Sequence, residues 1–314
     1  MLVYLIKRIG LAMVIIVISV SMLYGMIHMV PGDPISIILG PRATDEMREV
    51  LRDRMGLDKP FLVQIGRFLF NVVKGDLGED VFTNRPVTQI VFEQLPYTIV
   101  LILTALAWAL LVSIPLGCYS AILRTSILDK ITGVVSVGTI AIPAFVVAVY
   151  TLLIFAVTPQ WLPAIGAGRE GDLWDQVIHL IMPAFCLGLS WVGYVARLVR
   201  ASMLDVMQEN HVRTVRAYGL PERLIIFRYA LRVAIMPVIA LVGVGVGYLL
   251  SAAVFIEIIF ARPGIGRLIF DSVGTRNYPV VMGTVLIMTI LFVISTTISD
   301  LVAAAVDPRL REKL

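Results

Sequence analysis

The chain has 314 residues, of which 59% are hydrophobic and only 15% are charged. Typical soluble domains are about 45–50% apolar and about 25% charged. Together with a mean hydropathy of +0.92, this composition excludes ordinary soluble enzymes, disordered chains and disulfide-rich modules, since too little polar surface would remain to cover a core. The net charge of +4 fits a membrane protein, because basic residues accumulate on its cytoplasmic side. No basic stripe interleaves with aromatic residues, so we expect no nucleic-acid partner.

Six apolar stretches are long enough to cross a bilayer, which requires about 20 residues of helix. The first follows Lys7 and Arg8 but is longer than the apolar region of a signal peptide, so we expect a retained helix. The six predicted spans are Ile9–Val30, Pro96–Leu123, Ile131–Val157, Val177–Leu198, Val233–Phe260 and Val280–Val306.

The first connection, after residue 34, predicts two short amphipathic helices. Thr44 is a typical N-cap, and Gly56 a typical residue after a helix end. The second helix is expected to begin at Pro60, with an apolar stripe, and to end at Gly75. These helices either pack on the membrane surface and the bundle or form a docking surface for an external partner.

The connection between spans four and five is rich in arginine, and both ends of the chain carry basic residues, whereas Thr158–Gln176 carries a single Arg169 among acidic residues. The positive-inside rule therefore predicts six spans with both termini inside. Three arginines in the outer connection Ala261–Pro279 are an exception to this pattern.

The arginine-rich inner connection predicts a helix, a forced turn and a second helix. Asp205 to Tyr218 has helical character, and Gly219 ends it because glycine adopts the left-handed conformation cheaply. The next helix is expected to begin at Pro221 and to bury the apolar stretch Leu224–Phe227. This arrangement either transmits force from a soluble partner or serves only as a topological signal.

Span five carries small residues at four-residue spacing, namely Gly243, Gly247 and Ser251. Such a ridge allows another helix to approach closely, and it also leaves room for a solute path. We favour helix packing.

Several kinds of chemistry have no signature in the chain. No Gly-Lys pair exists, so a P-loop for ATP is missing, and the three histidines are not at metal-binding spacing. Cys118 and Cys186 lie in apolar runs and are expected to be packing residues. Spans two to four carry no Asp, Glu, Lys or Arg in their interiors, which disfavours ion-coupled transport. We therefore expect a transmembrane helix bundle that has no energy source of its own and is driven by a partner protein.

At this point a series of short motifs resembles one family. The chain is similar to permease subunits of ATP-binding-cassette (ABC) importers, in the dipeptide, oligopeptide and nickel branch, over nearly its whole length. The motifs, in this order, are Pro31-Gly32-Asp33-Pro34, Leu57-Asp58-Lys59-Pro60, Gly75-Asp76-Leu77-Gly78, Arg85-Pro86-Val87, Trp161-Leu162-Pro163, Arg200-Ala201-Ser202-Met203-Leu204-Asp205-Val206, Pro263-Gly264-Ile265-Gly266-Arg267, Tyr278-Pro279-Val280 and Asp307-Pro308-Arg309.

The resemblance implies an all-α integral membrane protein with six transmembrane helices, the type I ABC importer transmembrane domain. Residues 1–95 would form the first span and an extracytoplasmic helical segment, 96–307 a five-helix core, and 308–314 a cytoplasmic tail. Within the core, residues of about 205–221 would be the coupling helix. The expected coupling residues are Arg213, Thr214, Arg216, Ala217 and Gly219, although Val215, Tyr218, Asn210-His211 and Val233 depart from the usual residues.

The resemblance also implies a function in the bacterial inner membrane. The chain would not be an enzyme and would bind no cofactor or metal itself, while ATP and Mg²⁺ would be used by two ABC ATPase subunits. A homologous second permease, an extracytoplasmic solute-binding protein and membrane lipid would be its other partners. We expect import of di- or oligopeptides by alternating access. A nickel or metal-chelate importer, an ion-coupled secondary carrier and a non-transporting membrane scaffold stay open as alternatives.

Overall fold

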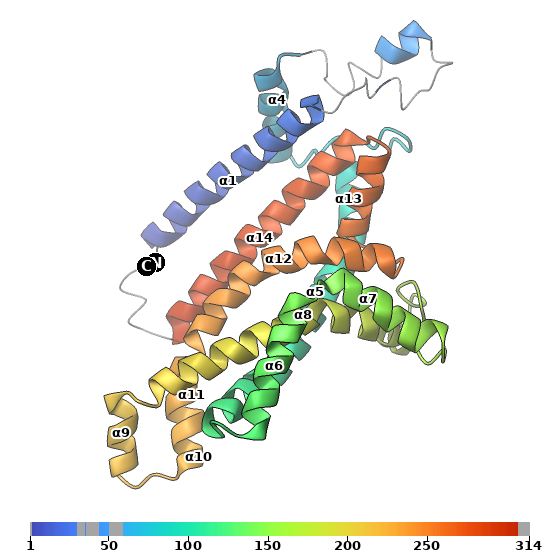
Figure 1. Ribbon diagram of the computed structural model, residues 1–314. Coiled ribbons are helices and arrows are strands. Elements are labelled where there is room, and N and C mark those ends of the chain that lie inside the picture. Colours follow the sequence, from blue (N-terminus) through green and yellow to red (C-terminus); the bar gives the residue numbers. More distant parts are fainter. Residues whose placement is uncertain (1, 30–34, 36–43, 50–58, 307–314) are drawn as a thin grey trace. The chain divides into compact units, whose positions relative to one another are not determined.

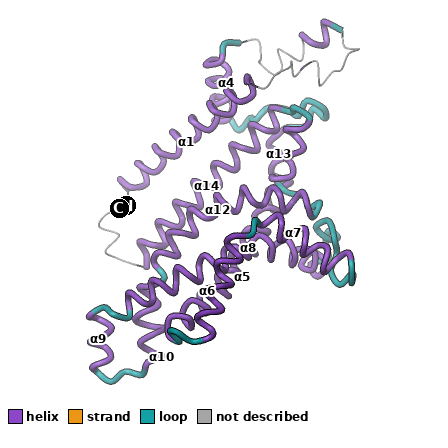
Figure 2. Tube along the Cα trace, viewed as in Figure 1, coloured by secondary structure: helices purple, strands orange, loops and turns teal. Residues whose placement is uncertain are grey.

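The computed structural model describes residues 2–29, 35, 44–49 and 59–306, and the regular structure of this part of the chain is helical (Figures 1 and 2). One isolated antiparallel bridge joins Glu79 and Pro86. The helices are α1 (Leu2–Met29), α4 (Phe61–Val73), α5 (Val87–Ile122), α6 (Ile127–Ala141), α7 (Ala144–Leu152), α8 (Leu173–Val206), α9 (Asn210–Ala217), α10 (Glu222–Leu224), α11 (Leu231–Ala234), α12 (Met236–Ile259), α13 (Ile265–Gly274) and α14 (Tyr278–Val306), with π-helical turns at Leu153–Val157 and Ile225–Ala230.

The chain folds as two compact units. Unit 1 comprises Met1–Thr98 and Pro263–Ile294, and unit 2 comprises Ile99–Arg262 and Ser295–Leu314. Two long helices, α5 and α14, therefore contribute residues to both units.

In the described part of the chain, five helices are long and apolar enough to cross a membrane, and there is a sixth crossing if one bent helix pair counts as a span. The five lie where spans one, two, four, five and six were predicted, and the structure extends several of them. The second begins at Val87 rather than Pro96, and the fourth runs over Leu173–Val206 rather than Val177–Leu198. The extra length comes from helical turns with polar residues, which continue each helix beyond its apolar stretch.

The third predicted span, Ile131–Val157, is not one straight helix. It is divided into Ile127–Ala141 and Ala144–Val157, which meet at 96°. Ile142 is extended, with φ −91° and ψ 120°, and Pro143 follows it. Proline disfavours the α conformation of the residue before it and lacks an N–H for the helical ladder, so this predicted span is a bent helix pair rather than one straight helix.

Unit 2 is organised around α8, which packs against α6, α7 and α12. A Cβ at Gly188 would overlap Trp108 of α5, and one at Gly193 would overlap Thr139 of α6. Trp108 donates its ring N–H to the carbonyl of Ala184 at 2.8 Å. Glycines on α8 thus allow neighbouring helices to approach more closely than side chains would permit.

Unit 1 contains the predicted outer segment. Thr44 accepts a hydrogen bond from the N–H of Met47 at 3.3 Å, which confirms the predicted N-cap, whereas residues 50–58 lie outside the described residues. In α4, Pro60 occupies the N-cap rather than the first helical position. Phe68 of α4 packs edge-on against Tyr24 of α1, with ring centroids 6.1 Å apart.

Some sequence motifs fall on residues whose structure is not described. These are the motif at 31–34, the first half of the motif at 57–60, the motif at 307–309 and the predicted tail at 308–314.

Candidate functional site

The predicted coupling helix is α9, at a projection beyond the end of α8 (Figure 1). The stretch Asp205–Tyr218, predicted as one helix, is divided: α8 continues to Val206, and α9 begins at Asn210. The N–H groups of Gln208 and Glu209 bond to carbonyls three residues back, at 3.1 and 3.0 Å, which tightens the last turn and ends α8.

One side of α9 packs on the protein and the rest is open to solvent. Val212 is fully buried and Val215 is half-buried, so these two valines hold the helix on the protein. Ala217 is exposed. Arg213, Thr214 and Ala217 recur at the spacing of one helix face, so they present a continuous exposed surface.

A glycine turn closes α9. Gly219 has φ +74°, a conformation that L side chains rarely adopt, and no atom lies within 4 Å of the position that a Cβ would take. The N–H of Gly219 bonds to the carbonyl of Arg216 at 3.0 Å. Backbone conformation, rather than crowding, therefore requires glycine here.

Arg216 ties the two sides of this turn together. Its Nε donates to Oε1 of Glu222 at 2.6 Å, and its Nη2 donates to Oε2 at 3.2 Å. The hydrogen bond from Arg216 is the main cause that lowers the pKa of the Glu222 carboxyl from its usual value. Sequence analysis placed Arg216 in the motif but did not identify Glu222 as its partner.

The chain after the turn is only partly as predicted. Ile225 and Ile226 are buried, but Phe227 is 49% exposed and Leu224 only half-buried. The π-helical turn Ile225–Ala230 explains the difference, because its wider winding shifts the face that each residue occupies.

A second network connects three helices near this end of α8. Arg200 donates from Nε to Oδ1 of Asp129 at 2.5 Å and from Nη2 to Oδ2 at 2.8 Å. Ser120 of α5 donates its hydroxyl to the same carboxylate at 2.5 Å. The sequence alone did not predict this cluster, although Asp129, three residues after the Ser126 N-cap, was a local signal for it.

The small residues that form the ridge on α12 differ in how closely other helices pack against them. A Cβ at Gly243 would overlap Ser299 of α14, whose hydroxyl donates to the carbonyl of Ile239 at 2.5 Å. Gly247 is half-buried, and Ser251 is exposed and donates to the Gly247 carbonyl at 3.2 Å. Gly245, between them, faces Trp191 of α8 so closely that a Cβ would overlap the indole.

The cysteines and histidines have ordinary surroundings. Cys118 and Cys186 are buried free thiols. His179 has its Nδ1 2.7 Å from the carbonyl oxygen of Asp175, while the side chain of His28 is outside what the structure describes. Among the described residues, no three His, Cys, Asp or Glu side chains gather in a group that could hold a metal ion.

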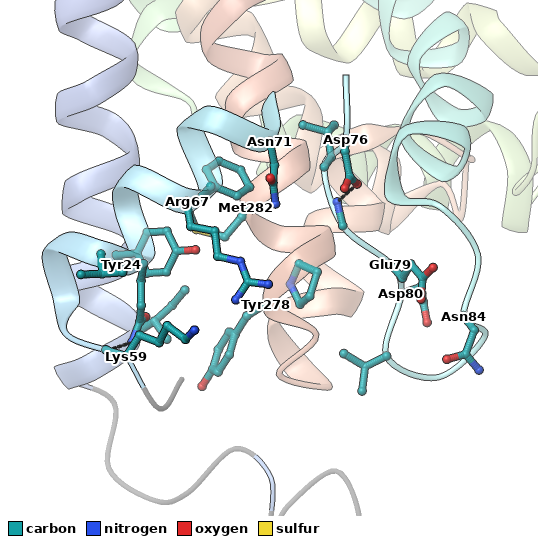
Figure 3. A pocket seen from close by; sticks show the side chains of 18 residues that line it. Tyr24, Lys59, Arg67, Asn71, Asp76, Glu79, Asp80, Asn84, Tyr278 and Met282 are labelled. Atoms are coloured by element: carbon teal, nitrogen blue, oxygen red, sulfur yellow. Dashed lines mark hydrogen bonds between the residues drawn. The ribbon is translucent and has the colours of Figure 1, made fainter. Parts of the chain in front are cut away.

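A cavity of about 400 Å³ lies in unit 1, between α1, α4, the 76–84 loop and the start of α14 (Figure 3). Its polar lining includes Lys59 and Arg67 together with Asp76, Glu79 and Asp80. Sequence analysis did not identify this site, because its residues come from four separate segments.

Comparison with known proteins gives concordant results. Residues 113–312 match the model of the binding-protein-dependent transport system inner membrane component, and residues 1–102 match that of the N-terminal part of such membrane components. The chain is 36% identical to the glutathione transport system permease protein GsiC of Pectobacterium atrosepticum. It is 35% identical to GsiC of an Escherichia coli strain, and both alignments cover 100% of each chain.

A solved structure agrees on the fold. An inward-facing MetNI methionine ABC transporter matches with a TM-score of 0.56 and 15% identity, over 70% of this chain and 97% of that chain. The helical architecture is thus the type I importer transmembrane domain, in a permease embedded in the bacterial inner membrane.

The chain belongs to the family of binding-protein-dependent transport system inner membrane components. It is a permease subunit of an ABC importer, a transport protein without an ATPase site of its own, as the resemblance implied. Membership implies that a solute-binding protein and ATPase subunits are its partners.

Proposed function

We propose that this permease imports small peptides, with glutathione as the first candidate, by alternating access. The observation that carries the proposal is the 36% identity, over the full length of both chains, to a permease whose name specifies glutathione. Glutathione is itself a tripeptide, so this substrate refines the di- and oligopeptide class predicted from the sequence.

The proposed assembly has a homologous second permease, two ABC ATPase subunits and one extracytoplasmic solute-binding protein in a lipid bilayer. The five or six crossings in the described residues of one chain supply half of a pathway. In this assembly ATP and Mg²⁺ are used by the ATPase subunits, and the permease itself binds no cofactor.

In this proposal α9 docks on an ATPase subunit. Arg213, Thr214 and Ala217 supply the exposed contact face, while Arg216 and Gly219 fix the turn that connects α9 to α10. Support comes from the burial of Val212, which anchors the helix to the chain, and from the conformation of Gly219. Movement of the ATPase would thereby reach α8 and α12.

For Gly243 we propose a packing role, because Ser299 occupies the space that a side chain would need. Gly247 and Ser251 are less enclosed and are proposed to border the pathway or a neighbouring helix.

The test is uptake by proteoliposomes that contain the assembled transporter. We expect labelled glutathione or a dipeptide to enter only when ATP is inside and the binding protein is outside. Uptake of nickel without peptide uptake would favour the metal importer. Uptake by the permease alone, driven by an ion gradient, would contradict the proposal.

A further inference from the structure

We propose that the cavity in unit 1 is a binding site for a small zwitterionic solute, of the size and charge pattern of a di- or tripeptide. The inference deepens the proposed function, on which it rests, because it places a solute site on the permease itself. Its volume of about 400 Å³ falls in the range of small-molecule sites, about 300–1,000 Å³.

The charges that line the cavity are separated by sign. Lys59 and Arg67 lie on the α4 side, whereas Glu79 and Asp80 lie on the loop side (Figure 3). A zwitterionic peptide carries a carboxylate at one end and an ammonium at the other. The two walls therefore match its two ends, and arginine in particular binds carboxylates through paired donors.

The cationic groups are available for a ligand. Arg67 and Lys59 are exposed, and neither forms an ion pair with another described residue. On the opposite wall, Asp76 and Asp80 already accept loop N–H groups: that of Gly78 at 2.8 Å for Asp76, and those of Phe82 and Thr83 at 2.7 and 2.8 Å for Asp80. These bonds hold the loop carboxylates in place, and each carboxylate keeps lone pairs for an ammonium group.

A buried acceptor supplies an independent indication of a ligand. Gln64 of α4 lines the cavity and is only 6% exposed. Its Nε2 donates to the carbonyl of Lys59 at 2.7 Å, but its Oε1 accepts no hydrogen bond from the described residues. Buried polar atoms are rarely left unpaired, because the loss of hydration costs free energy. A peptide N–H or ammonium group would satisfy this oxygen.

The remaining lining suits the side chains of a peptide. Val63, Phe68, Pro279 and Met282 are apolar, and Tyr278 adds an aromatic ring with a polar end. Apolar walls with a few placed polar groups are the usual composition of a small-molecule site.

The test is direct binding of trialanine and glutathione to the assembled transporter in lipid nanodiscs, without the binding protein, by calorimetry. We expect both peptides to bind, and N-acetylated, C-amidated trialanine to bind at least about tenfold more weakly, a loss of about 1.4 kcal/mol. Arg67→Gln is expected to weaken the binding of trialanine by a similar factor. Arg85→Gln is the matched control, since Arg85 lies outside the cavity and pairs with Glu93 at 2.6 Å.

Equal binding to wild type and Arg67→Gln, or no difference between free and capped trialanine, would overturn the proposal. So would a loss of affinity for the binding protein in Arg67→Gln with trialanine binding unchanged, since the cavity would then hold part of that protein. ATP-driven uptake in the same preparations separates the two proposals: uptake without direct binding removes only the cavity site, whereas absence of uptake removes the import function.

Discussion

Arg216 donates two hydrogen bonds to the carboxylate of Glu222, at 2.6 and 3.2 Å, across the turn at Gly219. The pair joins the end of α9 to the start of α10 and leaves Arg213 and Thr214 exposed. The sequence motif thus contains two kinds of arginine, one that orients the turn and one that is free to face a partner.

Glu222→Gln is expected to weaken binding of the ATPase subunit up to about fivefold, because exposed ion pairs contribute about 0.2–1 kcal/mol. The fold should persist, since both side chains are about half exposed. Affinity measured with the purified ATPase subunit checks this, with Glu93→Gln, in the exposed Arg85 pair, as control. Equal affinities of the wild type and Glu222→Gln would contradict an orienting role.

The same pair predicts a pH dependence. The hydrogen bond from Arg216 lowers the folded-state pKa of Glu222 from its usual value, so the stabilising contribution of the pair is present above the unfolded pKa and is lost as pH falls through the folded one. The protection factor for hydrogen exchange of the Gly219 turn, which is corrected for the intrinsic exchange rate, is therefore expected to be constant near neutral pH and to fall below about pH 4.5. Glu222→Gln should have a lower protection factor at neutral pH and show no such fall.

Gly219→Val is expected to uncouple ATP hydrolysis from uptake while membrane insertion stays intact. The left-handed conformation costs about 1–2 kcal/mol for an L residue, more for a β-branched one, and open space rules out a clash as the cause. Gly219→Asn should be milder, because asparagine tolerates this conformation. The ratio of uptake to ATP hydrolysis is the measurement, and an unchanged ratio in the valine variant would refute the role of the turn.

Gly245→Ala is expected to destabilise the bundle by about 1–3 kcal/mol, because the new methyl group would overlap Trp191. Gly133→Ala in α6 is the matched control. Its Cβ would meet no atom within 4 Å, so the change should be neutral or slightly stabilising. Thermal unfolding of the assembled transporter distinguishes the two, and similar midpoints would show that the Trp191 contact is dispensable.

Asp129→Asn is expected to lower stability by about 1–3 kcal/mol, since it removes the charge that pairs with Arg200. The loss should stay below that of a fully buried pair, because the Arg200 side chain is 31% exposed and can be hydrated. Arg85→Gln, in a pair whose members are both 44% exposed, should change stability little. If the two variants have the same midpoint of thermal unfolding, the pair of Asp129 and Arg200 does not stabilise the fold.

Properties that depend on local sequence were predictable. Apolar length identified six spans, five of which are single long helices among the described residues, because each helix satisfies its backbone hydrogen bonds within its own segment. The left-handed residue at Gly219 and the N-cap at Thr44 are likewise set by neighbours in the chain. The bend at Pro143 also has a local cause, because proline restricts the conformation of the residue before it.

By itself, the sequence determined the membrane class, the positions of most spans and the location of the glycine turn for which we propose a coupling role. Only the tertiary structure decided that Asp129 meets Arg200, that Gly245 faces Trp191 and that four segments enclose one cavity. The reason is physical: pairing between helices depends on their relative rotation and crossing, which packing of whole surfaces sets, whereas a span or a turn depends only on residues a few positions apart.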